Sequence, residues 1–332
     1  MAPTSVDGCA LQVEDLKMFF AVTKGLLRRK VADIKAVDGV SFAIRRGETL
    51  GLVGESGCGK TTVGRCVMRL YRPTAGSILL DGQDIASLSE SQLRPYRRHT
   101  AIVLQDPASS LDPRQSIGKI VTEPLTVHHL RRGRNECRGR VAELFEMVGL
   151  DPGLMERYPH ELSGGQRQRV AIARSLAGDP SLIVCDEPVS ALDVSIQAQI
   201  INLLKELQER IAGLTYLFIS HDLWLVHHLS TRVAVMYTGR IVEIGDTDEI
   251  FDNPVHPYTQ ALLSAVPTAD PVAERQRIPM VLQGETPSLL HRPSGCHFHP
   301  RCPRALPECA KTDQVLRDVG NDHLVACIRA KR

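Results

Sequence analysis

A short segment at residues 54–62 combines three glycines with a lysine and two threonines. Glycines at these positions let the backbone turn tightly and direct successive N–H groups at one anion. Lys60 is expected to reach the β- and γ-phosphates of a nucleotide, and the Thr61 hydroxyl to bind Mg²⁺. The segment therefore predicts an ATP-binding phosphate loop. It consists of Gly54, Glu55, Ser56, Gly57, Cys58, Gly59, Lys60, Thr61 and Thr62, which fits G-x-x-x-x-G-K-[ST].

The flanking residues distinguish this loop from a glycine-rich turn that binds nothing. An apolar run precedes it at residues 49–53, and apolar residues at helical spacing follow it at 63–70. A strand before the loop and a helix after it are the context that the pattern requires, because the helix N-terminus adds to the attraction for phosphate.

Two adjacent acidic residues, Asp186 and Glu187, follow the apolar run at residues 182–185. Such a run predicts a buried parallel strand. Asp186 at its end is expected to hold the Mg²⁺ bound by Thr61, and Glu187 to orient or deprotonate a water in line with the γ-phosphate. The alternative is that both acids cap the next helix.

Gln105 and His221 also follow predicted strands, at residues 101–104 and 214–219. The carboxyl ends of parallel strands face one ligand crevice. Gln105 is expected to touch Mg²⁺ or the attacking water, and His221 to hold the γ-phosphate and Glu187. A lone histidine is more often structural, which is the alternative for His221.

A second element suited to an anion is formed by Ser163, Gly164, Gly165 and Gln166. Ser163 is a good N-cap, and the paired glycines expose the backbone N–H groups of the helix that follows. An ordinary capped helix would have the same sequence, so this element alone is a weak signal.

The elements that position these residues predict an α/β protein with a P-loop core. Alternating residues at 11–48 and a strand–turn–strand pattern at 76–85 predict an antiparallel β subdomain. The spacing of Phe20 within it predicts a core aromatic. Residues 106–158 predict an inserted helical subdomain, and residues 232–243 predict a hairpin.

The composition predicts a globular chain of about two domains, with 332 residues, 43% hydrophobic content and a net charge of +2. This charge gives no electrostatic case for nucleic acid. The sequence shows no apolar run long enough to span a membrane and no leader segment, so we expect a cytosolic chain.

The ordered motifs make residues 10–250 resemble the ATP-binding subunit of an ABC transporter. The resemblance implies that Phe20 stacks on adenine, that Gln105 is the Q-loop glutamine, that Asp193 belongs to the D-loop and that His221 is the switch histidine. It also implies that Ser163, Gly164 and Gly165 bind the ATP held by a partner's phosphate loop. Hydrolysis would then need a head-to-tail dimer.

Residues 253–263 and the cysteines after them resemble the C-terminal extension, at 251–332, of dipeptide and oligopeptide importer ATPases. Residues 105–107, 110–114 and 166–169 are similar to the second of the two paralogous ATPase subunits. The resemblance implies a paralogous ATPase partner, two integral membrane permease subunits, an extracytoplasmic solute-binding protein and a peripheral location on the cytoplasmic face of the inner membrane. Import of glutathione or a nickel chelate, a soluble non-transport ABC ATPase and an ATP-holding regulatory subunit are the alternatives.

Four of the nine cysteines crowd the tail, which in a reducing compartment favours a metal site over disulfides. Their spacing lacks the paired C-x₂-C of a structural zinc site. Four thiolates can hold a [4Fe–4S] cluster without it, and members of the resembled family carry one there. His297 and His299 keep a mixed zinc site as the alternative. The four cysteines are Cys296, Cys302, Cys309 and Cys327.

Overall fold

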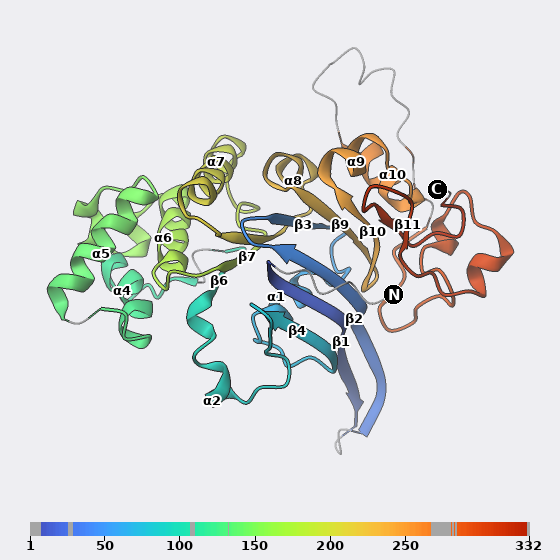
Figure 1. The fold of residues 1–332 in the computed structure, drawn as a ribbon, viewed down its shortest axis with the longest axis horizontal. Helices are drawn as coiled ribbons and strands as arrows, with labels where there is room; N and C mark the ends of the chain where they lie inside the picture. The colour runs from blue at the N-terminus through green and yellow to red at the C-terminus, as the bar shows by residue number, and fades with distance from the viewer. Residues whose placement is uncertain are drawn as a thin grey trace, which may run out of the picture.

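The computed structural model describes residues 8–25, 29–106, 110–131, 133–266, 280, 282 and 284–330. Its largest element is a mixed sheet whose strand order, within the described residues, is β11-β12-β10-β9-β3-β8-β7-β6 (Figure 1). Neighbouring strands from β9 to β6 are parallel, while β9, β10, β12 and β11 pair antiparallel. The strands are β3 (Thr49–Val53), β6 (Thr100–Val103), β7 (Leu182–Asp186), β8 (Thr215–Ile219), β9 (Arg232–Tyr237), β10 (Arg240–Asp246), β11 (Arg317–Asp318) and β12 (Leu324–Val325).

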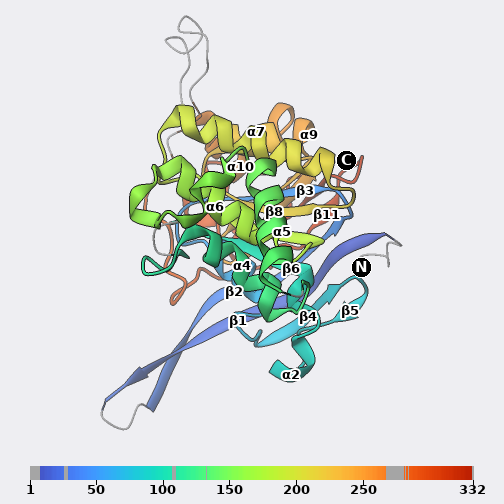
Figure 2. The ribbon, with the colours of Figure 1, turned by 90° about the vertical axis from the view of Figure 1, so that its left-hand side faces the viewer.

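The second sheet is antiparallel and has the order β2-β1-β4-β5 among the described residues. Its strands are β1 (Cys9–Lys24), β2 (Arg29–Arg45), β4 (Ala75–Leu80) and β5 (Gln83–Asp84). Figure 2 shows that β1 and β2 continue beyond the rest of the sheet as a long ribbon. Asp81 and Gly82 both have positive φ, as a two-residue hairpin turn requires. The predicted antiparallel strands are therefore confirmed.

Helix α1 (Lys60–Val67) lies between the two sheets. Its apolar residues Val63, Cys66 and Val67 share one buried cluster with Leu11 of β1 and Leu52 of β3. Every residue of β3, β7 and β8 is buried, which explains why these strands appear in the sequence as unbroken apolar runs. This packing fixes the loop that joins β3 to α1.

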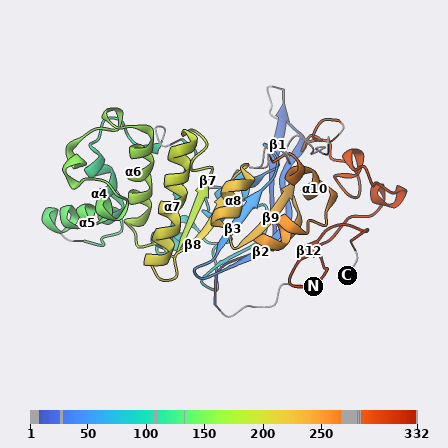
Figure 3. The same cartoon turned by 90° about the horizontal axis from the view of Figure 1, so that it is seen from above.

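Helices cover the other face of the mixed sheet and form one end of the molecule (Figure 3). The predicted helical region contains α4 (Ile117–Val127), α5 (Arg134–Met147) and the 3₁₀ turn at Pro152–Glu156, although residues 107–109 and 132 lie outside the described residues. The remaining helices are α2 (Glu90–Leu93), α6 (Gly164–Leu176), α7 (Val194–Arg210), α8 (Leu223–Leu229), α9 (Thr247–Asp252) and α10 (Pro257–Ser264), with 3₁₀ turns at Arg97–His99, Pro159–Glu161, His299–Arg301 and Pro307–Ala310.

The tail packs on the mixed sheet at the opposite end from α4 and α5 (Figures 1 and 3). Strand β12 pairs with Glu243 and Ile244 of β10, so the tail extends the sheet. The Glu243 carboxylate is fully buried and accepts hydrogen bonds from the backbone N–H groups of Val255 (2.7 Å) and His256 (3.1 Å). His323 Nε2 lies 2.8 Å from the same carboxylate.

In the part of the chain that the structure describes, none of the helices combines the length and the apolar character needed to cross a membrane.

Candidate nucleotide-binding site

The phosphate loop joins β3 to α1, as the sequence predicts, and two of its glycines, Gly54 and Gly59, are required by close backbone approach. Gly54 has φ 152° and Gly59 has φ 111°. A Cβ on Gly54 would collide with the Met236 carbonyl oxygen, and one on Gly59 would collide with that of Ala36. Only glycine fits these two positions without moving the neighbouring strands.

Lys60 is buried at the start of α1, and its ammonium group points back into the loop. Lys60 Nζ donates hydrogen bonds to the carbonyl oxygens of Gly54 (2.7 Å) and Glu55 (3.1 Å). The ammonium group is therefore held at the centre of the loop, where phosphate oxygens of a nucleotide would be its acceptors.

Thr61 and Asp186, predicted as the Mg²⁺ ligands, are in direct contact. The Thr61 hydroxyl donates to Asp186 Oδ1 over 2.9 Å, although the two residues lie at the ends of different elements, α1 and β7. Asp186 is only 5% exposed, and burial raises the pKa of its carboxyl while the Thr61 hydrogen bond opposes the rise. Oxygen donors of this type suit Mg²⁺, which is usually bound through one or two carboxylates and substrate phosphates.

Glu187, Gln105 and His221 meet at the carboxyl ends of three neighbouring strands. Gln105 Nε2 donates to Glu187 Oε2 over 3.1 Å, and His221 Nδ1 lies 3.3 Å from the same oxygen. Glu187 has φ 49°, a left-handed conformation that is uncommon for a residue with a side chain and occurs often at functional sites. The strand-end reasoning therefore grouped these side chains as the structure does.

The second predicted anion element begins helix α6. The Ser163 hydroxyl accepts from the Gln166 N–H (3.2 Å), and the Gln166 side chain accepts from the Ser163 N–H (2.9 Å), which completes a capping box. Within the described residues, no recorded hydrogen bond or ion pair joins Ser163, Gly164, Gly165 or Gln166 to the phosphate loop. Asp193 is the exposed N-cap residue of α7 and is followed by Val194, which is 80% exposed.

Phe20 differs from the expectation based on its spacing. It lies on β1 but is only partly buried, and its ring packs edge-on against Tyr71 with the centroids 5.4 Å apart. Among the described residues, β4 pairs with β1 only as far as Lys17, so Phe20 lies in the part of β1 that pairs with β2 alone and stays partly exposed. The prediction of a core aromatic was wrong.

The four tail cysteines line one small pocket together with His256 and Phe298. Burial raises the pKa of the Cys296 thiol to about 11, and the neighbouring cysteines contribute to the rise. Within the described residues, no group of three or more His, Cys, Asp or Glu side chains is placed to hold a metal ion. His297 Nδ1 instead contacts the Thr238 hydroxyl (3.0 Å) and His299 Nδ1 the Cys296 carbonyl (2.9 Å), so the expected metal site is not seen.

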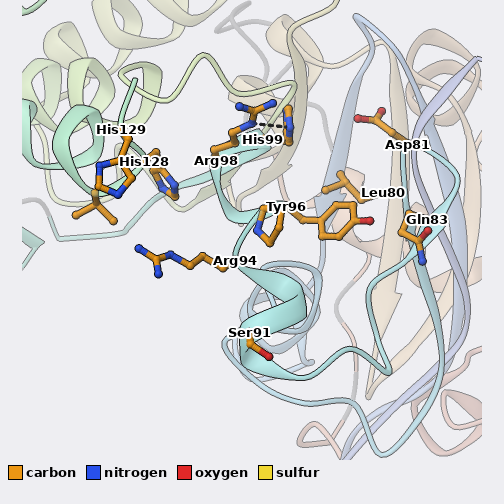
Figure 4. Close-up of a pocket in the computed structure, with 12 residues that line it drawn as sticks. Leu80, Asp81, Gln83, Ser91, Arg94, Tyr96, Arg98, His99, His128 and His129 are labelled. Carbon is orange, nitrogen blue, oxygen red and sulfur yellow. Dashed lines mark hydrogen bonds between the residues drawn. The ribbon is translucent and has the colours of Figure 1, made fainter. Parts of the chain in front are cut away.

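An open pocket of about 940 Å³ lies between the antiparallel sheet and the end of α4, away from the phosphate loop (Figure 4). Arg94 and Arg98 supply positive charge on its wall. Burial and then these arginines lower the pKa of His128, while burial and Arg98 lower that of His99. The pocket therefore combines the positive charge of Arg94 and Arg98 with two imidazoles, His99 and His128, whose pKa is lowered.

Three further residues contact the phosphate loop and were not predicted from the sequence: Tyr258, Thr286 and Arg301. Tyr258 lies within the tail segment 253–263, which was singled out only for its family resemblance. No local pattern marks Thr286 or Arg301, because their contacts depend on how the tail folds back.

The fold and these groups define a P-loop ATPase. A family model described as ABC transporter matches residues 37–190, and one described as the C-terminal region of oligopeptide/dipeptide transporters matches residues 242–309. The chain belongs to the ATP-binding proteins of the oligopeptide/dipeptide ABC transporter family, which hydrolyse ATP.

Two oligopeptide transport ATP-binding proteins align with nearly the whole chain, and two solved ABC structures align with about three quarters of it. The oligopeptide transport ATP-binding protein AppF of Bacillus subtilis is 54% identical over 320 residues, which cover 96% of each chain. OppF of Salmonella typhimurium, with the same description, is 49% identical over 321 residues and 96% of each chain. A solved dimer of the ATP-binding cassette MJ0796 in a post-hydrolysis state with ADP and Pi has a TM-score of 0.62 at 29% identity, covering 71% of this chain and 98% of that one. The cbiO1 structure from Clostridium perfringens has a TM-score of 0.64 at 29% identity, covering 74% and 92%.

Proposed function

We propose that this chain hydrolyses ATP at a site completed by a second ABC subunit and that hydrolysis powers peptide import. The observation that carries the proposal is the placement of Glu187, held by Gln105 and His221, beside the Asp186–Thr61 pair. The relatives named as oligopeptide transport proteins supply the substrate class.

In this mechanism the chain's work is positioning and charge stabilisation. The phosphate-loop N–H groups and Lys60 bind the β- and γ-phosphates, and Phe20 on β1 stacks on adenine. Thr61 and Asp186 would hold Mg²⁺, which would supply charge neutralisation at the phosphate oxygens. Glu187 accepts a proton from the attacking water, while Gln105 and His221 keep its carboxylate in line.

In the proposed dimer, Ser163, Gly164, Gly165 and Gln166 of this chain bind the γ-phosphate of the ATP held by the partner's phosphate loop, and the corresponding segment of the partner does the same for this chain. Support comes from the capped helix N-terminus that these residues form, and from its separation from this chain's own phosphate loop. The exposed Val194 beside Asp193 would be covered in such a dimer. The partner is proposed to be the paralogous ATPase, with this chain as the second of the pair.

Two permease subunits and an extracytoplasmic solute-binding protein complete the proposed transporter, with this chain on the cytoplasmic face of the inner membrane. The pocket in Figure 4, at the end of α4, supports docking of an acidic permease segment. Arg94 and Arg98 on its wall would attract the negative charge of such a segment. A glutathione or nickel-chelate importer would use the same site, as would a soluble non-transport ATPase.

The proposed units are a nucleotide-binding domain at 10–250, with a helical subdomain at 106–158, and an extension at 251–332. In the extension we propose that Cys296, Cys302, Cys309 and Cys327 bind a [4Fe–4S] cluster. Four thiols facing one pocket are the donor set that such a cluster takes, and a cluster spreads its ligands over several iron atoms. A zinc ion would need every sulfur about 2.3 Å from one point. Iron and sulfide analysis of anaerobically purified protein tests this, and stoichiometric zinc without iron would reject it.

The central test replaces Glu187 by Gln in the complete transporter. The variant should bind ATP and form the ATPase dimer, but its phosphate release should slow roughly 10²- to 10⁴-fold, because a general base has been removed. Near-normal turnover would remove Glu187 from the mechanism. Purification of the wild type from detergent-solubilised membranes should recover a second ATPase and two membrane proteins, whereas recovery of ribosomes or DNA would refute the transporter assignment.

A further inference from the structure

Three residues of the tail hold Glu55, the second residue of the phosphate loop. The Glu55 backbone N–H donates to the Tyr258 phenol oxygen over 2.9 Å, and the Thr286 hydroxyl donates to the Glu55 carboxylate. Arg301 Nη1 donates to both carboxylate oxygens, at 2.9 Å to Oε2 and 3.1 Å to Oε1. The tail therefore fixes both the backbone and the side chain of a loop residue.

These contacts are largely shielded from water. The Arg301 side chain is 9% exposed and that of Glu55 is 24% exposed, so solvent screens the ion pair less than it screens a surface pair. Tyr258 is fully buried, and its ring lies 4.6 Å from that of Tyr237, over which the Arg301 guanidinium sits at 6.0 Å. Packing on this scale limits the positions that Arg301 can take.

Glu55 also connects the tail to the phosphate-binding lysine. Its carboxylate contacts Arg301, whereas its carbonyl oxygen accepts from Lys60 Nζ at 3.1 Å. A shift of Glu55 would therefore move an acceptor of the lysine and the N–H groups on either side of it. The phosphate loop binds ATP best when these groups are already in place, because ordering them on binding costs affinity.

We propose that Arg301 is a positioning residue for the phosphate loop: through Glu55 it holds the loop in the shape that receives the ATP phosphates. Arg301 does not contact the nucleotide in this scheme. The proposal rests on ATP binding at the loop, which is part of the proposed function, and it does not depend on which solute is transported.

The position of Arg301 is set by hydrogen bonds to the backbone of the cysteine region. It ends the 3₁₀ turn His299–Arg301, which starts with a hydrogen bond from the His299 N–H to the Cys296 carbonyl (3.0 Å). The turn closes with a bond from the Cys302 N–H to the His299 carbonyl (3.3 Å). The fold of the cysteine-bearing tail is thereby connected to nucleotide affinity.

The test is a double-mutant cycle on ATP affinity in the full-length chain, measured by titration with a fluorescent ATP analogue. Arg301→Gln should weaken binding on the order of tenfold, because the charge-assisted contact of Nη1 with both carboxylate oxygens is lost. Glu55→Gln should weaken binding by a similar factor, and the double variant should bind no more weakly than either single variant. Arg301→Lys, which keeps the charge, should recover part of the affinity.

Kinetics in the assembled transporter separate positioning from stability. Arg301→Gln should raise the KM for ATP while kcat at saturating ATP stays within about twofold, because Glu187, Gln105 and His221 do not contact Arg301. The control is Arg304→Gln. Arg304 is an exposed arginine of the same region, and within the described residues no hydrogen bond or ion pair joins its side chain to the phosphate loop. The KM of this variant for ATP should equal that of the wild type.

The proposal is overturned if Arg301→Gln binds ATP as tightly as the Arg304→Gln control. It is also overturned if Arg301→Gln loses as much affinity in the Glu55→Gln background as in the wild type. A purely structural role would lower the unfolding temperature without nucleotide and leave KM unchanged. If Arg301→Gln does not fold, the same double-mutant cycle is measured with Arg301→Lys in its place, and the same two results would overturn the proposal.

Discussion

Acid should destabilise this protein through His256, the residue that caps helix α10. His256 is 1% exposed, and its Nδ1 accepts from the Tyr258 N–H at 3.1 Å, a contact that needs the unprotonated nitrogen. Burial lowers the pKa of His256 from 6.5 to about 4, although the Glu243 carboxylate, itself bonded to His323, opposes the shift. The native protein therefore keeps this imidazole neutral over a range in which the unfolded chain protonates it.

The sign of the effect follows from proton binding. As pH falls below 6.5, His256 becomes protonated in the unfolded state but stays neutral in the folded state. The free energy of unfolding therefore decreases until pH reaches about 4. A gap of this size between the two pKa values corresponds to a loss of about 3 kcal/mol. Because the bonded Tyr258 also holds Glu55, the loss should loosen the tail and the phosphate loop together.

The assay compares the wild type with His256→Asn by thermal unfolding at a series of pH values. Asparagine keeps a side-chain oxygen for the cap but does not titrate, and the cavity it leaves lowers stability equally at every pH. The difference between the two proteins should therefore shrink steadily from pH 6.5 towards pH 4. Parallel unfolding temperatures across this window would refute the reasoning.

Two further predictions concern the phosphate loop. Thr61→Val keeps the shape of the side chain but removes the hydroxyl that donates to Asp186 and would hold Mg²⁺. The variant should weaken Mg²⁺-dependent ATP binding by about tenfold or more, whereas binding measured with EDTA present should change little. Gly54→Ala should cost several kcal/mol in the free energy of unfolding because its Cβ meets the Met236 carbonyl, while Gly57→Ala, with open space around it, should cost about 1 kcal/mol; equal losses measured by urea unfolding would contradict the explanation.

The parts of the site that could be predicted are those set by neighbours in the chain. Three parts of the site depend on a few consecutive residues each, so the sequence alone predicts their chemistry. They are the phosphate loop, the strand end at Asp186 and Glu187, and the N-cap at Ser163. Gln105 and His221 could be added because parallel strands end at one edge of a sheet. Phe20 could not be placed by spacing, since whether a strand residue is covered depends on what lies above the strand.

The tail contacts escaped prediction for a different reason. Arg301 and Glu55 are 246 positions apart, and neither lies in a pattern that names the other. Separation along the chain does not indicate that the tail lies beside the phosphate loop. The structure brings them together through the aromatic cluster of Tyr237, Tyr258 and Phe298, whose ring contacts become visible only in three dimensions.

The pairing of β12 with β10 also has a consequence for biosynthesis. His323 reaches Glu243 across 80 residues, so β10 leaves the ribosome long before the strand that covers its edge. During that interval the edge of β10 is unpaired and the Glu243 carboxylate lacks its contact with His323. A nascent chain in this state can be bound by chaperones or can aggregate. Truncation between β10 and β12 should therefore produce insoluble protein, although the phosphate loop, Asp186, Glu187 and His221 are all retained.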